Sequence, residues 1–317
     1  MKLREFYRLA IETGMDNDPR GRKKMEKLLK LAKESFVELK AEKKKYFDRD
    51  RLINPYADTR ILNGDKDAEI KRILVGIDME AGEIVLADRL MEKQKIDLVL
   101  SHHPEGRGLA NLHEVMSIHS DVAASFGVSI TAAEGVMLTR IKEIERRLMP
   151  VNHFRAVDAA KLLRLNFMCA HTVADNCVAN FLQKKMDTEK PETIKELLEL
   201  LLEIPEYSLS EAAGVGPSLI AGRDNAKAGR IMVDMTGGTE GSKELIEKWA
   251  RAGVNTVVGM HFSEEHRKEM DKHFINAVIA GHISSDNLGL NLLFDEIIKK
   301  GGKLEFIECS GFRRVKR

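Results

Sequence analysis

The chain has 317 residues, and its 51 lysine and arginine residues nearly balance its 50 aspartate and glutamate residues, which gives no indication of a nucleic-acid or membrane partner. Charged residues make up 32% and apolar residues 43% of the sequence, as in ordinary globular proteins, and the length suggests two domains or one domain with a large insertion. No signal peptide and no long apolar segment are recognised, so we expect a cytoplasmic protein in which Cys169, Cys177 and Cys309 are reduced packing residues.

The first 65 residues predict an N-terminal helical extension. Apolar residues recur at helical spacing up to about residue 47, and Gly14 and Pro19 divide this stretch into two helices. Lys43, Lys44 and Lys45 make the end of the second helix basic, but glutamates interleaved at helical spacing favour a solvated face with internal ion pairs over a polyanion site. Residues 48–65 are expected to be extended and rich in turns.

Strands alternate with helices in the rest of the chain, which predicts an α/β protein. We expect two α/β lobes built from pseudo-duplicated βα units, with mixed sheets flanked by helices and the N-terminal helical extension added. The expected ranges are 1–65 for the extension, 66–175 for a first lobe with a helical insert, 176–228 for a helical linker and 229–317 for the second lobe. The predicted strands are 73–77, 96–100, 128–131, 167–170, 230–235, 256–258, 277–280 and 304–307. The predicted helices after residue 65 are 81–94, 111–126, 133–148, 154–163, 177–185, 190–206, 242–252, 263–272 and 287–300.

A pair of adjacent histidines, His102 and His103, directly follows the predicted strand 96–100. Open α/β sheets bind their ligands at the carboxyl ends of parallel strands, so the pair is well placed to bind metal ions or a substrate. Pro104 ends the strand and would hold the rings in place. The alternative is a polar loop with two solvated histidines.

Two further strand ends carry a histidine and an aspartate four residues apart, His171 with Asp175 and His282 with Asp286. Residues at this spacing share a face of a helix, and they can also lie close across a strand-to-helix turn. Either pair alone could be structural, because aspartate is a common N-cap; for Asp286 we keep N-capping of the final helix as a serious alternative.

The three strand ends together match the needs of a two-metal site. Two divalent ions that share a bridging carboxylate and keep open positions for water require about this number of ligands. Nitrogen and oxygen ligands without thiolate suit Zn, Mn, Fe, Co or Ni. We therefore predict two divalent metal ions per chain. The candidate ligands are His102, His103, His171, Asp175, His282 and Asp286.

Two other polar segments follow predicted strands. The glycine-rich turn 236–241 precedes a helix, where backbone N–H groups could hold a phosphate, but it lacks the Lys-Ser or Lys-Thr of a P-loop and a plain βα turn is favoured. His261 and His266, near Glu264 and Glu265, fit a solvated helix start; the two histidines are also candidates for general acid–base catalysis beside a metal pair. The remaining histidines are assigned no role, namely His113, His119, His153 and His273.

The strand ends also resemble motifs of a known family. Residues 98–104 (LVLSHHP) resemble the "ISHHP" signature of the NIF-three-like family, also described as GTP cyclohydrolase I type 2. Residues 170–175 (AHTVAD) are similar to its "AHTxxD" element, and residues 280–286 (AGHISSD) to its closing "GHxxxE". The three occur in the family's order, so the resemblance covers roughly residues 70–310.

The resemblance implies two α/β lobes around a dinuclear metal site and subunits that commonly form a toroidal hexamer. It implies His102, His103, Asp175, His282 and Asp286 as ligands, with His171 as a ligand or as a group that orients Asp175. The chain departs from the family at two places. Asp286 stands where the family usually has the longer Glu, and Met260 and His261 stand where it often has the acid of a "TGE" or "TGD" element.

Our leading hypothesis is therefore a dinuclear-metal protein that acts as a metal-dependent hydrolase on a small-molecule substrate. Nothing in the sequence identifies a purine pocket, so a GTP cyclohydrolase activity rests on the resemblance alone. The alternative is a non-catalytic, metal-binding regulatory or scaffold protein. In either case we expect a homo-oligomer with no nucleic-acid or membrane partner.

Overall fold

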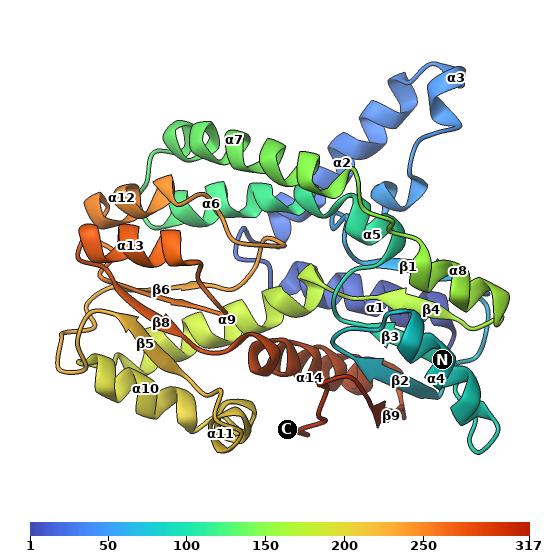
Figure 1. Cartoon of the computed structure of the whole chain (residues 1–317). Helices are drawn as coiled ribbons and strands as arrows, with labels where there is room; N and C mark the ends of the chain where they lie inside the picture. Colours follow the sequence, from blue (N-terminus) through green and yellow to red (C-terminus); the bar gives the residue numbers. More distant parts are fainter.

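Two mixed β-sheets carry the fold, and helices cover their faces (Figure 1). The computed structural model describes all residues, 1–317. The five-stranded sheet has the order β1 (Arg60–Asn63), β4 (Phe167–Cys169), β3 (Leu98–Ser101), β2 (Arg72–Gly76) and β9 (Glu305–Glu308). The four-stranded sheet has the order β5 (Ser218–Ala221), β8 (Asn276–Ile279), β7 (Thr256–Gly259) and β6 (Ile231–Asp234).

The two sheets repeat one topology, which confirms the prediction of two pseudo-duplicated α/β lobes. In each sheet the first strand of the unit pairs antiparallel with the last, and the other three strands run parallel (β1 with β4–β3–β2, and β5 with β8–β7–β6). The additional strand β9 pairs parallel with β2, so the end of the chain returns to the first sheet. The expected domain ranges stay a prediction.

The helices surround these sheets, and two short 3₁₀ turns lie at Arg49–Leu52 and Leu112–Ser117. None of the helices is both long enough and apolar enough to cross a membrane. The helices are α1 (Leu3–Asp16), α2 (Arg22–Glu38), α3 (Ala41–Lys44), α4 (Ala81–Met91), α5 (Gly106–Ala110), α6 (Ile118–Ser125), α7 (Ile130–Leu148), α8 (Arg155–Leu162), α9 (Thr172–Glu189), α10 (Ile194–Leu202), α11 (Pro205–Ala212), α12 (Glu244–Arg251), α13 (Glu264–Lys272) and α14 (His282–Gly301).

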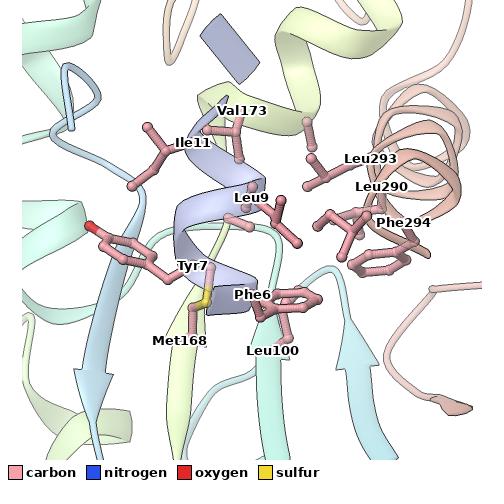
Figure 2. Close-up of a cluster of buried hydrophobic side chains, with 14 of the residues drawn as sticks. Phe6, Tyr7, Leu9, Ile11, Leu100, Met168, Val173, Leu290, Leu293 and Phe294 are labelled. Carbon is pink, nitrogen blue, oxygen red and sulfur yellow. The ribbon is translucent and has the colours of Figure 1, made fainter. Parts of the chain in front are cut away.

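Helix α1 belongs to the main core, although the sequence predicted it as part of a peripheral extension. Phe6 and Leu9 lie against Leu290 and Phe294 of α14, with Leu100 of β3 close by (Figure 2). The aromatic pair Phe6 and Phe294 has ring centroids 6.3 Å apart. Within the first 65 residues only the segment around α2 and α3 projects from the body (Figure 1).

Helices α9 and α14 pack along each other and join the two lobes. Their close approach requires Gly289, because a Cβ atom there would lie 2.6 Å from the carbonyl oxygen of Ala174. Helix α9 follows β4 of the first sheet and α14 follows β8 of the second. Packing these helices therefore brings together the carboxyl ends of strands from both sheets.

Three local predictions differ from the structure. The predicted strand 128–131 is wrong, because Ile130 begins helix α7; a short apolar run does not distinguish a strand from a helix. Strands β1 and β5 were not predicted, because both are half-exposed antiparallel edge strands with only two or three consecutive apolar residues. Helices α9 and α14 begin at Thr172 and His282, each five residues before the predicted start.

Candidate metal centre

The three predicted strand ends meet at the junction of the two sheets. His102 and His103 follow β3, and His171 is the N-cap residue of α9 directly after β4. His282 is the first residue of α14 after β8. The structure thus gathers all six predicted ligands in one place, in three overlapping groups whose ligand atoms lie within 4.8 Å of one another: His102 with His103 and His171, His103 with His282 and Asp286, and His102 with Asp175 and Asp286.

His102 is fully buried and directs its Nε2 atom toward two carboxylates. Its Nδ1–H donates to the carbonyl oxygen of Ala170 at 3.1 Å, which leaves Nε2 with a free lone pair in the neutral ring. Nε2 lies 3.3 Å from Asp286 Oδ1 and 3.4 Å from Asp175 Oδ1. These three atoms are buried without a hydrogen-bond partner. A ring nitrogen with a free lone pair and two carboxylate oxygens repel one another at these distances unless a cation or a proton lies between them.

His103 and His282 form a second group around the other oxygen of Asp286. His103 Nδ1 lies 2.6 Å from Asp78 Oδ1, so its Nε2 faces the cluster. That Nε2 is 3.3 Å from His282 Nε2 and 3.5 Å from Asp286 Oδ2. His282 Nε2 is also 3.5 Å from Asp286 Oδ2.

These separations fit ligands that share a cation better than direct hydrogen bonds. Nitrogen and oxygen ligands lie about 2.0–2.2 Å from a zinc ion in tetrahedral coordination, which places two ligand atoms roughly 3.3–3.6 Å apart. Asp286 turns Oδ1 to His102 and Oδ2 to His103 and His282, which is the arrangement of a bridging carboxylate. Burial opposes ionisation of Asp286, but when no metal is bound a protonated His102 outweighs burial and holds the pKa of the carboxyl well below its usual range. The two carboxylates in turn raise the pKa of His102, so a proton takes the place of the cation between them.

Asp286 is not a helix cap. Helix α14 begins at His282 with Gly281 as its N-cap residue, so the alternative assignment of Asp286 as the N-cap is wrong. Its side chain is almost completely buried and points into the cluster. The shorter side chain, compared with the family's Glu, still reaches the imidazoles of three histidines.

His171 is oriented by a buried carboxylate that the sequence did not reveal. Its Nδ1 lies 2.9 Å from Asp58 Oδ2, and Asp58 also accepts a hydrogen bond from the Thr172 hydroxyl at 2.6 Å. His171 Nε2 faces the cluster, 3.8 Å from Asp175 Oδ2. The resemblance left open whether His171 binds a metal or orients Asp175. Its free nitrogen beside the cluster favours the role of a ligand.

A small cavity of about 70 Å³ opens beside the cluster. His171, Asp175 and His282 line one side, and residues of the second sheet line the other, with no lysine or arginine among them. His261 lies on this second side with its ring centroid 4.8 Å from that of His282 and its Nδ1 3.5 Å from Glu240 Oε1. The hydrogen bond and the charge of Glu240 raise the pKa of His261 above its ordinary value.

His266 is less available for chemistry than His261. Its Nδ1 lies 2.7 Å from the Ser263 hydroxyl and its Nε2 lies 3.2 Å from the carbonyl oxygen of Gly241, so both ring nitrogens are engaged. Glu264 and Glu265 form exposed ion pairs with nearby cations, as a solvated helix start predicts.

The glycine-rich turn at the cavity is held by a histidine to which the sequence assigned no role. His119 Nε2 lies 2.9 Å from the carbonyl oxygen of Thr239, and its Nδ1 lies 3.3 Å from Asp234 Oδ1. Gly237 has φ +105°, and a Cβ atom there would lie 2.6 Å from His119 Nε2. The turn therefore needs glycine and is fixed against the first lobe by α6.

The sequence analysis did not identify several of these supporting residues. Two of them follow the same rule that identified the histidines, which is a position at the carboxyl end of a parallel strand. Asp78 and Asp234 lie at the carboxyl ends of β2 and β6, the same position in the sheet that identified the histidines. Asp58 precedes the short strand β1, which the sequence did not reveal. Its contact with His171 joins residues 113 positions apart, and no local pattern signals such a contact.

The fold and the cluster together define a two-lobed α/β protein with a buried histidine–aspartate centre suited to metal ions. No family sequence model and no curated protein sequence matches the chain. Its structure is similar to that of a NIF3 superfamily protein from Sphaerobacter thermophilus, with a TM-score of 0.69 and 26% sequence identity over 80% of this chain and 91% of that one. Reduced HcgD from Methanocaldococcus jannaschii shares the fold, with a TM-score of 0.52 and 15% identity over 79% of this chain and 88% of that one. This structural similarity confirms the resemblance of the motifs to the NIF-three-like family.

Proposed function

We propose that the protein binds two divalent metal ions and uses them to hydrolyse a small-molecule substrate. The observation that carries the proposal is the carboxylate of Asp286, which is buried without a hydrogen-bond partner and directs one oxygen to each of two ligand groups. His102 and Asp175 would hold one ion with Asp286, beside His171, and His103 and His282 would hold the other. A bound divalent ion supplies Lewis acidity and lowers the pKa of water.

The residues of the chain supply orientation and proton transfer. Ala170, Asp78 and Asp58 fix the rings of His102, His103 and His171, so the ligand nitrogens are preorganised. His261 lines the cavity beside His282, and it is the better placed of the two predicted proton carriers, because both ring nitrogens of His266 are engaged. Glu240 would hold the ring of His261 toward a substrate.

The cavity favours a small substrate, or one end of a larger one. A volume of about 70 Å³ is less than half of the 150 Å³ or so that holds benzene in an engineered core, so it would not enclose a purine ring. A nucleoside triphosphate would also find no lysine or arginine in the lining. A GTP cyclohydrolase activity and a toroidal hexamer therefore rest on the family resemblance, and the substrate class we favour is small and uncharged or singly charged.

Metal content measured by inductively coupled plasma mass spectrometry tests the proposal. Wild-type protein incubated with Mn, Zn or Fe and then desalted should retain about two ions per chain, as a two-metal site requires. The variant His103→Ala should lose at least one of them. His273→Ala is the matched control, because His273 pairs with Glu269 on α13 away from the cluster, and it should keep the full complement. A wild-type protein that stays metal-free with all three metals would contradict the proposal.

Activity separates a hydrolase from the scaffold alternative. Metal-loaded wild-type protein should hydrolyse at least one member of a panel of small cyclic amides and phosphoesters, with GTP included. A fully loaded protein that is inactive against the whole panel would favour a metal-binding scaffold.

A further inference from the structure

The charge of the chain is distributed unevenly. Residues 22–46, which include α2 and α3 and are called the basic arm below, contain ten basic and four acidic side chains, a net charge of +6. The other residues carry 41 basic and 46 acidic side chains, a net charge of −5. The near-neutral total therefore conceals a strongly basic element on an acidic body.

The basic arm has few partners in its own subunit. Met25 is the single buried residue of the 17-residue helix α2, and α3 has none. Arg22, Lys24 and Lys30 form ion pairs, and the other seven basic residues of the arm form none. Val37 is 72% exposed and Tyr46 is 81% exposed. A helix gains most of its stability from a packed face, so an arm this exposed has a surface left to pack.

The most acidic helical segment lies in residues 192–211, which include α10 and α11 and are called the acidic face below. It contains six acidic residues and one basic residue. Glu206 is buried with Arg317, whereas the other five acids are exposed. Glu192, Glu199 and Glu203 pair with Lys227, Lys195 and Lys185, respectively. Glu196 and Glu211 have no ion pair. Leu209, which is 56% exposed on α11, adds an apolar contact beside these charges.

The basic arm and the acidic face lie at opposite ends of the molecule. Figure 1 shows α2 and α3 projecting from the upper right and α10 and α11 at the lower left. The arm therefore does not reach the acidic face of its own subunit. A contact between two different patches joins subunits head to tail, and such contacts close into rings or continue as filaments.

We propose that the basic arm of one subunit docks on the acidic face of a second copy of the chain. The lysines around α3 face the exposed glutamates of α10, and Val37 and Tyr46 cover Leu209. The contact is built from exposed charges, so each ion pair contributes little to the binding free energy. Salt screens all of these pairs and therefore weakens the whole contact. The inference does not depend on the metal centre, and metal content reports separately on the proposed function.

Sedimentation velocity of the full-length protein tests this contact. Wild-type protein should form assemblies whose dissociation constant rises at least about tenfold between about 0.05 M and 0.5 M NaCl. Reversing the arm charges (Lys43→Glu, Lys44→Glu and Lys45→Glu) should abolish this salt-dependent association. Reversing the acidic face (Glu196→Lys, Glu199→Lys and Glu203→Lys) should do the same, and an equimolar mixture of the two variants should associate again, because each reversed patch then meets its complement.

A matched control distinguishes this contact from a general effect of charge. The triple variant Lys268→Glu, Lys272→Glu and Lys299→Glu changes three exposed lysines outside both patches and should associate like the wild type. Wild-type protein whose association does not change with salt would overturn the proposal, as would salt-dependent association that survives reversal of the arm. Monomers that bind a single-stranded oligonucleotide through the arm lysines would identify a nucleic acid as the partner instead.

Discussion

The variant Asp286→Asn removes the charge that we place between the two ligand groups while keeping the shape of the side chain. In the structure the two carboxylate oxygens lie 3.3–3.5 Å from the nitrogens of His102, His103 and His282. Asparagine offers an oxygen to one group and an NH₂ donor to the other, so it cannot bridge. Because Gly281 is the N-cap residue of α14, the substitution leaves the helix cap intact.

The size of the effect follows from linkage between binding and folding. Suppose that the substitution lowers the affinity for each ion about 100-fold. At a fixed metal concentration above the dissociation constants of both proteins, the metal-dependent part of the unfolding free energy then falls by about 2.7 kcal/mol per ion. Urea denaturation with excess Mn and with a chelator gives this difference for each protein. Taking the difference removes whatever the substitution does to the metal-free protein.

Asp295→Asn is the matched control for this experiment. Asp295 lies further along α14 and pairs with Arg314, away from the cluster. Its substitution should lower stability equally with and without metal. A metal-dependent stabilisation of Asp286→Asn as large as that of the wild type would refute the bridging role.

Three further predictions concern residues around the cluster. Asp58→Ala removes the hydrogen bond that orients His171 and should weaken metal binding about 10–100-fold by titration calorimetry, whereas unchanged affinity would remove Asp58 from the site. His261→Gln should lower turnover about 10²–10⁴-fold with unchanged metal content, and full activity would exclude His261 as the proton carrier. Burial opposes charge on His119, but Asp234 outweighs it and raises the pKa of the folded ring. The stabilisation from charged His119 is therefore complete below about pH 6.5 and is lost as the pH rises through the folded-state pKa. His119→Gln should then destabilise the protein more at about pH 6 than at about pH 9 in urea denaturation, and equal losses would contradict this sign.

The sequence predicted the histidine–aspartate cluster well because its residues obey a local rule. His102 and His103 follow a buried strand, and the pairs ending in Asp175 and Asp286 follow two others. Parallel strands of one sheet end at one edge, which makes such residues neighbours without knowledge of the tertiary structure. The local rule does not show how two different sheets meet; that depends on Gly289 at the contact of α9 with α14.

The parts that were missed depend on contacts between distant segments. Asp58 and His119 look like ordinary loop and helix residues in the sequence, and their roles appear only when His171 and the glycine-rich turn pack against them. Helix α1 has the apolar spacing of any amphipathic helix, so its burial beside Phe294 was not evident. In each case the missing information is which partner segment covers the residue.

Anomalous diffraction from crystals of the Mn- or Zn-loaded protein tests the two-metal site most directly. We expect two peaks per chain on either side of the Asp286 carboxylate, one beside His102 and Asp175 and the other beside His103 and His282. A single peak that contacts only one oxygen of Asp286, or peaks outside this cluster, would contradict the bridged two-metal centre.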